Sequence, residues 1–264
     1  MSPPRLLFGK LRRRVVVLAG ALLAAAIAAA VVGTAPQAQE AAPRAVVYRG
    51  PASCPGCSEA VAGLIRQSPR DFSVRFIGPK EQLKLTPENL RGVDLYAQPG
   101  GNGSVSRAQK VFGYQSNRTV KSYVSGGGHF VGFCMGAYLA GSNPGMGLLS
   151  PGNTGQYIRT RGASIRTTRD AVIPVGWQGA GRRHFAQDPP YIIPSGVAGE
   201  RILSRFTNKK VNALVRPYGA GGVGVVGTHP EATRGWYSSE LWKRDKDKLD
   251  AAQGLRLIAY TMRF

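Results

Sequence analysis

The stretch HFVGFCMGAYLA, residues 129–140, sets the architecture of this chain. Its first five residues are mainly apolar and predict a buried strand, and the residues after Cys134 have the composition of a helix start. Gly132 and Gly136 flank the cysteine, and glycines there permit a turn that brings neighbouring backbones too close for side chains. This is the pattern of a nucleophile elbow with cysteine in place of serine, and the helix N-terminus beneath Cys134 favours the thiolate. The alternative interpretation is a buried structural cysteine.

Strands and helices alternate on the N-terminal side of this stretch. Buried-strand patterns occupy residues 45–48, 72–77 and 93–97, and helix patterns occupy residues 58–67 and 105–124, with a short helical turn from Thr86. This alternation predicts an α/β fold with a mostly parallel, doubly wound sheet of the flavodoxin-like type.

The pattern changes after residue 144, where glycine and proline are frequent and the strands are short. Strand patterns at 171–175 and 191–193, and a hairpin of 211–215 with 223–226, predict an antiparallel extension of the sheet. Residues 238–262 predict a C-terminal helix with a break at Gly254. No repeat of about 20–50 residues is apparent, so we expect one domain from residue 44 to residue 264.

Two further segments follow strands and carry chemistry. Pro99-Gly100-Gly101 comes after the strand at 93–97, and α/β sheets bind ligands at the carboxyl ends of their strands. His229 follows the apolar residues 223–226 and lies two residues before Glu231, which can orient the imidazole and stabilise its charge. Seen in isolation, His229-Pro230-Glu231 is a surface turn, but beside the Cys134 elbow it predicts the base for a cysteine nucleophile. His129 and His184 are interpreted as structural.

Taken in this order, Pro99-Gly100-Gly101, the Cys134 elbow and His229-Pro230-Glu231 resemble the class I glutamine amidotransferase-like superfamily. The closer similarity is to the domain at the N-terminus of eukaryotic biotin-protein ligases, which also occurs as free-standing bacterial proteins. It covers nearly all of residues 45–237 and includes VYRGP at 47–51 and YAQPGG at 96–101. The resemblance implies a class I glutamine amidotransferase fold and a catalytic triad of Cys134, His229 and Glu231. It also implies an oxyanion hole made by the Met135 amide with that of Gly100 or Gly101.

The chain departs from the family pattern at Tyr138. Glutamine-hydrolysing members usually carry glutamine four residues after the nucleophile, where it helps to hold the substrate. Glutamine hydrolysis is therefore not expected, and Tyr138 is assigned to the substrate pocket. Biotin attachment is not expected either, because a biotin-ligase catalytic domain has no room after residue 264.

The resemblance instead implies a cysteine-dependent amidase or hydrolase that needs no cofactor. Its substrate would be a small molecule or peptide whose amide or acyl bond is cleaved through a thioester. A non-catalytic binding module on the same fold is the alternative.

Cys54-Pro55-Gly56-Cys57 lies between the first strand and the first helix. This is the placement of thioredoxin-like redox sites, which makes a thiol-disulfide oxidoreductase the competing enzyme class. Such a site would explain neither the Cys134 elbow nor His229, so a local Cys54–Cys57 disulfide is the favoured interpretation, with Cys134 as the free thiol. A zinc site would need a fourth ligand such as His129, and no second paired-ligand motif supplies it, so no metal site is expected.

Residues 1–39 have the layout of an export segment. Five basic residues precede an unbroken apolar run at 15–32, and a small, polar, proline-containing stretch follows. The run is also long enough to remain as a membrane anchor, so a cleaved signal peptide and a retained anchor both stay open. Either one places the rest of the chain outside the cytoplasm.

The chain is strongly basic, with 35 Lys and Arg against 14 Asp and Glu and a formal net charge of +21. Charged residues make up only 19% of the chain, so this excess comes from a shortage of acids, and 43% hydrophobic residues exclude a largely disordered chain. Such a surface is expected to attract anionic cell-envelope material. An arginine concentration at 159–183 is without the aromatic interleaving of nucleic-acid-binding segments, so specific nucleic-acid recognition is not expected.

Overall fold

The computed structural model describes residues 41–101, 103–141 and 145–264. In these residues, five parallel strands form one side of the sheet. The parallel strands lie in the order β2 (Ser73–Ile77), β1 (Arg44–Tyr48), β3 (Leu95–Gln98), β4 (His129–Phe133) and β11 (Gly221–Val226). Most are connected through helices, as parallel strands require. The predicted α/β fold with a doubly wound sheet is confirmed.

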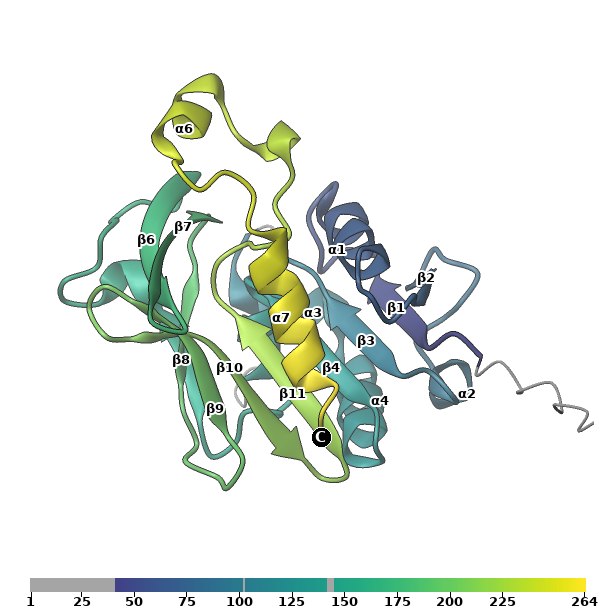
Figure 1. Ribbon diagram of the computed structural model, residues 1–264. Helices are drawn as coiled ribbons and strands as arrows, with labels where there is room; N and C mark the ends of the chain where they lie inside the picture. The colour runs from purple at the N-terminus through teal and green to yellow at the C-terminus, as the bar shows by residue number, and fades with distance from the viewer. Residues whose placement is uncertain (1–40, 102, 142–144) are drawn as a thin grey trace, which may run out of the picture. The chain divides into compact units, whose positions relative to one another are not determined.

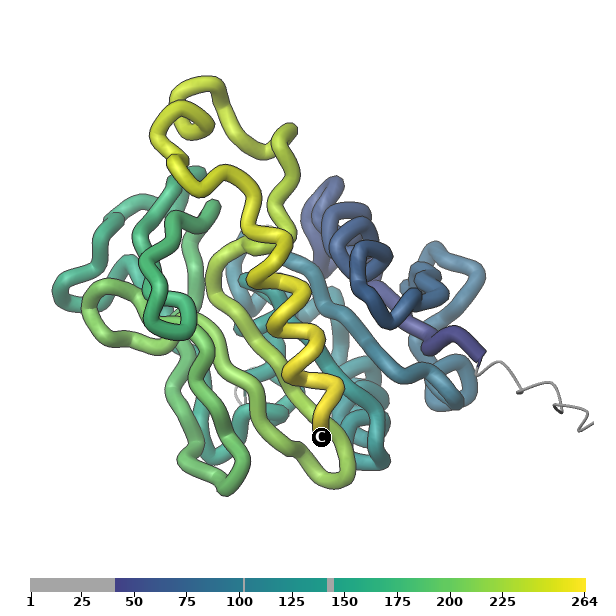
Figure 2. The backbone as a smooth tube through the Cα atoms, in the orientation of Figure 1, coloured from purple at the N-terminus to yellow at the C-terminus, as the bar shows by residue number. Residues whose placement is uncertain are grey.

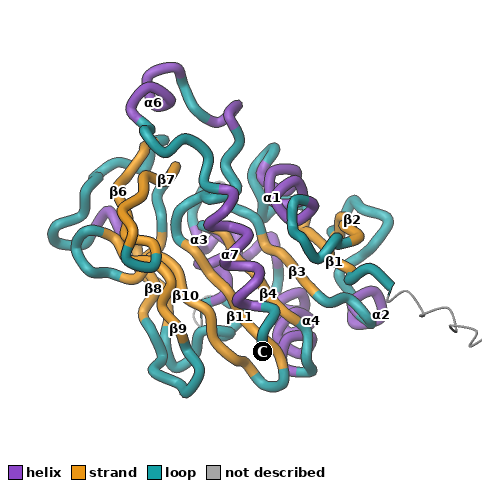
Figure 3. The backbone as a smooth tube through the Cα atoms, in the orientation of Figure 1, coloured by secondary structure: helices purple, strands orange, loops and turns teal. Residues whose placement is uncertain are grey.

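Helices cover both faces of this parallel sheet. Helices α1 (Cys57–Arg66) and α7 (Ala251–Thr261) lie on one face, and α3 (Val105–Phe112), α4 (Tyr114–Ser125) and α5 (Met135–Ala140) lie on the other (Figures 1 and 3). Successive strand side chains point to opposite faces, so Val46 and Tyr48 join the core under α3 to α5, and Ala45 and Val47 join the core under α1 and α7. Strands buried on both faces explain the nearly continuous apolar runs in the sequence.

The antiparallel strands extend the sheet beyond β11. Strand β10 (Val211–Tyr218) pairs with β11, and β9 (Arg201–Phe206), β6 (Ala171–Trp177) and β7 (Ala180–Ala186) follow in that order. Strand β8 (Pro190–Ile193) pairs with β10 and with β5 (Asn153–Gln156). A separate small core, in which the rings of Tyr157 and Phe206 stack at 3.9 Å, stabilises this extension. The predicted antiparallel extension is present and longer than the sequence indicates.

Two predicted helices are each divided in the structure. The helix predicted at 105–124 breaks at Gly113, whose φ of +83° favours glycine and separates α3 from α4. The predicted C-terminal helix consists of α6 (Ser239–Arg244) and α7, and the chain between them turns where Asp245 Oδ1 accepts hydrogen bonds from the backbone of Asp247 and Lys248, each at 3.1 Å. The break is therefore not at Gly254, which lies inside α7.

The C-terminal segment brings α7 back across the sheet, as the tube in Figure 2 traces. Gly254 permits this close packing, because a Cβ atom there would lie 2.6 Å from Leu64 Cδ2 of α1. Residues 41–264 form one compact unit. The remaining short elements are α2 (Pro87–Leu90) and two 3-10 turns, η1 (Tyr157–Arg159) and η2 (Arg234–Trp236).

Within the described ranges, no helix combines the length and the apolar character that crossing a membrane requires. The apolar run at 15–32, and the export segment as a whole, lie outside the described residues.

Candidate active site

Four chain segments meet at the carboxyl edge of the parallel strands. The loop that contains Cys54 follows β1, Gly100 and Gly101 follow β3, Cys134 follows β4, and His229 follows β11. Because these four strands are parallel neighbours, their carboxyl ends lie at one edge, where α/β sheets place ligands. The topology thus brings together residues that are far apart in the sequence.

Cys134 has the backbone of a nucleophile elbow. Its φ of 48° and ψ of −103° fall in a region that non-glycine residues rarely adopt, and such strain is maintained only when the surroundings fix it. The Cys134 N–H donates to Val226 O of β11 at 2.9 Å, and the Cys134 carbonyl accepts from Ala137 N at 2.9 Å. The residue is therefore held between the end of the sheet and the first turn of α5.

The two flanking glycines are required by close backbone packing. A Cβ atom at Gly132 would lie 2.7 Å from the carbonyl carbon of Gly136, so the strand and the helix start approach directly. A Cβ atom at Gly136 would overlap the backbone of Gln98 in β3. The elbow is thereby pressed against the neighbouring strand, as the glycine pattern predicts.

His229 lies between Glu231 and Cys134. Its Nδ1 contacts Glu231 Oε1 at 2.7 Å, and Cys134 lies close enough to help raise the pKa of the ring, while the Cys134 thiol donates to Gln187 O at 3.5 Å. A carboxylate accepts, so Nδ1 carries the proton in the first contact and Nε2 is left for the cysteine. The three predicted triad residues are thus brought together, and all three are buried.

The charge of His229 is set by opposing effects. Burial, the largest effect, lowers its pKa, but the nearby Glu231 and Cys134, together with the hydrogen bond to Glu231, outweigh burial and raise the pKa above its ordinary value of 6.5. The ring is also enclosed by aromatic edges, with centroid distances of 5.2 Å to Trp236 and 6.0 Å to Phe185. This surrounding favours an imidazolium ring held in one orientation.

The predicted oxyanion-hole residues lie next to the triad. A Cβ atom at Gly100 would come within 2.8 Å of His229 Cε1 and 3.8 Å of Cys134 Cβ. One at Gly101 would come within 2.9 Å of Met135 Cγ, so the glycine loop packs directly on the start of α5. Met135 is the first residue of α5, and a first-turn amide has no partner within its own helix.

A cavity of about 610 Å³ opens beside Cys134. Tyr138 lines it rather than filling it, and burial, together with the nearby Cys134 and Asp188, raises the pKa of the phenol, which stays neutral. Across the cavity, Arg159 Nε donates to Gln156 Oε1 at 2.5 Å, and Gln156 Nε2 donates to the carboxylate of Asp188 at 2.7 and 2.8 Å. The cavity thus has a polar wall with one cationic and one anionic end.

The comparisons with known proteins concern the fold and the first half of the described chain. Residues 44–145 match the model of the family described as biotin-protein ligase, N terminal. This match confirms the family resemblance over residues 44–145, and His229 and Glu231 lie outside the matched residues. A search of curated proteins gave no match.

Solved structures share the fold of this chain. A glutamine amidotransferase is 16% identical, with a TM-score of 0.51, and the alignment covers 71% of this chain and 90% of that one. A second glutamine amidotransferase, from Thermotoga maritima, is 12% identical with a TM-score of 0.57, over 84% of this chain and 99% of that one. The sheet is therefore of the glutamine amidotransferase type.

Cys54 and Cys57 are bonded to each other, with their Cα atoms 5.3 Å apart. Both line a smaller cavity of about 260 Å³ that also contains His229 and Trp236. The disulfide therefore lies beside the triad, a proximity that the sequence pattern does not indicate.

The other two histidines lie away from the cysteine. His184 is fully buried, and its Nδ1 contacts Thr228 Oγ1 at 2.8 Å. The His129 ring contacts the carbonyl oxygens of Asp94 at 3.0 Å and Phe264 at 3.1 Å. Both positions fit the structural roles expected for them. In the described part of the chain, no cluster of His, Cys, Asp and Glu has the geometry to hold a metal ion.

Sequence reasoning missed the residues on the far side of the cavity. Gln156 and Asp188 belong to the extension strands and their turns, and neither lies in a recognisable motif. Arg159 was noticed only as part of a basic concentration. Asp188 has a left-handed backbone, with φ of 44°, but this unusual conformation is seen only in the structure and could not be inferred from the sequence.

Proposed function

We propose that this protein is a cysteine-dependent amidase or hydrolase that cleaves an amide or acyl bond through a thioester. The observation that carries the proposal is the position of His229 between Glu231, which contacts its Nδ1 at 2.7 Å, and Cys134, which lines the cavity of about 610 Å³. A nucleophile, a base and a group that orients the base are the minimum set for this chemistry.

In the proposed reaction, the Cys134 sulfur attacks the carbonyl carbon of the substrate. The negative charge that develops on the carbonyl oxygen is stabilised by the amides of Met135 and of Gly100 or Gly101. His229 then donates its proton to the leaving amine or alkoxide, which departs and leaves a thioester on Cys134. His229 next takes a proton from water, whose attack releases the acid and restores the thiol.

The cavity favours a polar substrate. Arg159 and Asp188 are joined through Gln156 on its wall, so the site presents both a cation and an anion to a substrate bound at Cys134. Tyr138 takes the position where glutamine-hydrolysing relatives usually carry glutamine, so we expect an amide or ester other than free glutamine. No cofactor is needed for any step.

The test is acylation of the full chain by p-nitrophenyl acetate at pH 7, with the acetyl group located by mass spectrometry. Acetyl is expected on Cys134 of the wild-type chain, and none is expected in Cys134→Ala. The acylation rate should fall by about 10²-fold or more in His229→Ala, because the base is lost. His129→Gln is the matched control and should acylate like the wild type. An acetyl group on another residue, or a rate that His229→Ala leaves unchanged, would contradict the proposal.

A non-catalytic binding module is the second candidate, and the polar wall of the cavity is the observation that favours it. Such a module would bind small polar amides in the cavity without acylation of Cys134. In that case Asp188→Asn would weaken binding, and Cys134→Ala would leave it unchanged.

We further propose export of the chain, on the basis of the basic and apolar segments in residues 1–39. The basic body would then face anionic cell-envelope material. A C-terminal fusion to alkaline phosphatase, which is active only after export, should be active with residues 1–39 present and inactive without them. Equal activity of the two fusions would contradict export.

A further inference from the structure

The loop after β1, which contains Cys54 and is called the disulfide loop below, is hydrogen-bonded directly to the loop after β3, which contains Gly100 and Gly101 of the candidate oxyanion hole. The Cys54 N–H donates to the carbonyl oxygen of Gly100 at 3.0 Å. The carbonyl oxygen of Ala52 lies 2.6 Å from where a Cβ atom at Gly101 would be, so the two loops are also in close backbone contact. The loop after β3 therefore packs directly against the loop after β1.

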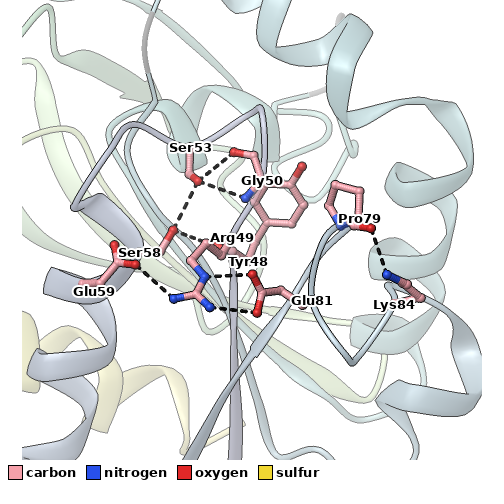
Figure 4. A network of polar contacts seen from close by, with 9 residues as sticks. All are labelled: Tyr48, Arg49, Gly50, Ser53, Ser58, Glu59, Pro79, Glu81 and Lys84. Atoms are coloured by element: carbon pink, nitrogen blue, oxygen red, sulfur yellow. Dashed lines mark hydrogen bonds and ion pairs between the residues drawn. The ribbon is translucent and has the colours of Figure 1, made fainter.

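The base of the disulfide loop is held by its own polar network (Figure 4). Ser58 Oγ donates to Tyr48 O at 2.8 Å, and Ser53 Oγ donates to Gly50 O at 2.9 Å. Arg49 donates to both carboxylate oxygens of Glu81 at 2.8 Å and to the exposed Glu59 at 3.1 Å. These contacts fix the part of the loop nearest β1.

The part nearest Gly100 depends on a different restraint. The network reaches Ser53, whose Oγ accepts from Ser58 Oγ at 3.1 Å, but Cys54 itself is not part of it, and Gly56 has a left-handed φ of 77° before α1 begins at Cys57. The Cys57 N–H donates to Cys54 O at 3.1 Å, and the disulfide closes the same short turn. The bond between Cys54 and Cys57 therefore ties the Cys54 backbone to the first turn of α1.

The hydrogen bond to Gly100 has a consequence for Gly101. The Gly100 carbonyl and the Gly101 N–H belong to one planar peptide unit, in which the C=O and N–H bonds of a trans peptide point in opposite directions. Fixing the carbonyl on Cys54 therefore fixes the direction of the Gly101 N–H. Gly101 borders the cavity that contains Cys134, and its amide is one of the two candidates for the glycine part of the oxyanion hole.

We propose that the Cys54–Cys57 disulfide is a positioning element for catalysis: it holds the Cys54 amide on Gly100 and thereby directs the Gly101 N–H toward the developing oxyanion. This inference rests on the proposed function. Reduction of the disulfide by a dithiol, which is itself oxidised to a cyclic disulfide, gives two thiols and frees the Cys54 backbone. Acyl transfer then becomes sensitive to the redox state of a bond that takes no part in the chemistry.

The test compares two reactions of Cys134 in the full chain. Acylation by p-nitrophenyl acetate passes through an oxyanion, whereas alkylation by iodoacetamide displaces iodide at a saturated carbon and forms none. In the double variant Cys54→Ser/Cys57→Ser, the acylation rate should fall about 10-fold, and alkylation should stay within about twofold of the wild type. A general loosening of the site would slow both reactions, so the ratio of the two rates reports positioning.

Reduction provides the same comparison without a mutation. Wild-type chain reduced with dithiothreitol and desalted should show the same fall in the ratio at Cys134, and the double serine variant should not respond to the reductant. Glu59→Gln is the matched control, because it removes an exposed contact at the loop base and leaves the disulfide in place. Its ratio should equal that of the wild type.

The outcomes separate the two proposals. Normal acylation of the oxidised wild type, with a ratio that neither reduction nor the double variant changes, would overturn the positioning role and leave the proposed function intact. No acylation of Cys134 in the oxidised wild type would overturn the proposed function and this inference together.

Discussion

Glu231 contributes to the site through its charge as well as its hydrogen bond. It contacts His229 Nδ1 at 2.7 Å, and its charge helps to raise the pKa of His229 against the effect of burial. Replacement Glu231→Gln keeps the side-chain shape but removes the charge, so the pKa of His229 should fall and the imidazolium beside Cys134 should be lost at lower pH.

The expected result is a rate of iodoacetamide labelling at Cys134 that is about 10-fold lower at pH 7 in Glu231→Gln than in the wild type. The measurement is the labelling rate between pH 5 and pH 9. Glu240→Gln is the control, because Glu240 is exposed and pairs with Arg244 one helical turn away. Identical pH profiles for wild type and Glu231→Gln would show that the Glu231 charge does not act on His229.

At the scale of elements, the sequence predicts those helices and strands whose form depends on residues close together in the chain. The strand into Cys134 and the flanking glycines were predictable, because the elbow needs an apolar strand and two positions without side chains. The two helix breaks were not, because the sequence does not show that Gly113 adopts a left-handed backbone or that the Asp245 carboxylate accepts from the next turn of the chain. Gly254 resembles a helix end in the sequence, yet it lies inside α7 because Leu64 packs against its Cα. Gly113 carries the same residue type and does end a helix.

Two glycines allow the backbone effect to be measured separately from packing. A Cβ atom at either Gly113 or Gly63 would have no heavy atom within 4 Å. Gly113 has a φ of +83°, whereas Gly63 lies within α1 and has ordinary helical backbone. Gly113→Ala should therefore destabilise the chain by about 1–3 kcal/mol, and Gly63→Ala should stabilise it by about 0.5–1 kcal/mol. Urea unfolding of both variants checks this, and equal effects would show that the α3–α4 break is not held by backbone conformation.

At the scale of the whole molecule, the parallel core could be predicted and the cavity could not. The order of Pro99-Gly100-Gly101, Cys134 and His229 points to one edge, because each follows a strand of the same sheet. Gln156 and Asp188 reach that edge only because β8 pairs with β10 and β5 pairs with β8, and such long-range pairing leaves no local signal. The contact of Cys54 with Gly100 joins two loops in the same way.

Asp250 lies in a buried polar region behind the site. Its Oδ1 lies 3.6 Å from Nε2 of the fully buried His184, too far for a hydrogen bond. Burial raises the pKa of Asp250 to about 8, with further contributions from Asp245 and Asp247, and burial lowers the pKa of His184 to about 3. The pair is therefore close to neutral, with the proton on the carboxyl group.

This arrangement makes the free energy of unfolding depend on pH. The pKa of Asp250 is higher in the folded chain than its ordinary value of 3.8, so the folded state binds the proton more tightly. The stabilising effect of that proton is present at low pH and is lost as pH rises from about 4 to about 8. Asp250→Asn cannot lose a proton, so its advantage over the wild type should grow by about 3–4 kcal/mol between pH 5 and pH 8 and level off by about pH 9. Urea unfolding at pH 5, 7, 8 and 9 measures this difference. Glu240→Gln, an exposed change in α6, should show no such rise. A constant difference between Asp250→Asn and the wild type across this range would mean that Asp250 is ionised in the folded chain at pH 5, and that His184 or Arg182 balances its charge.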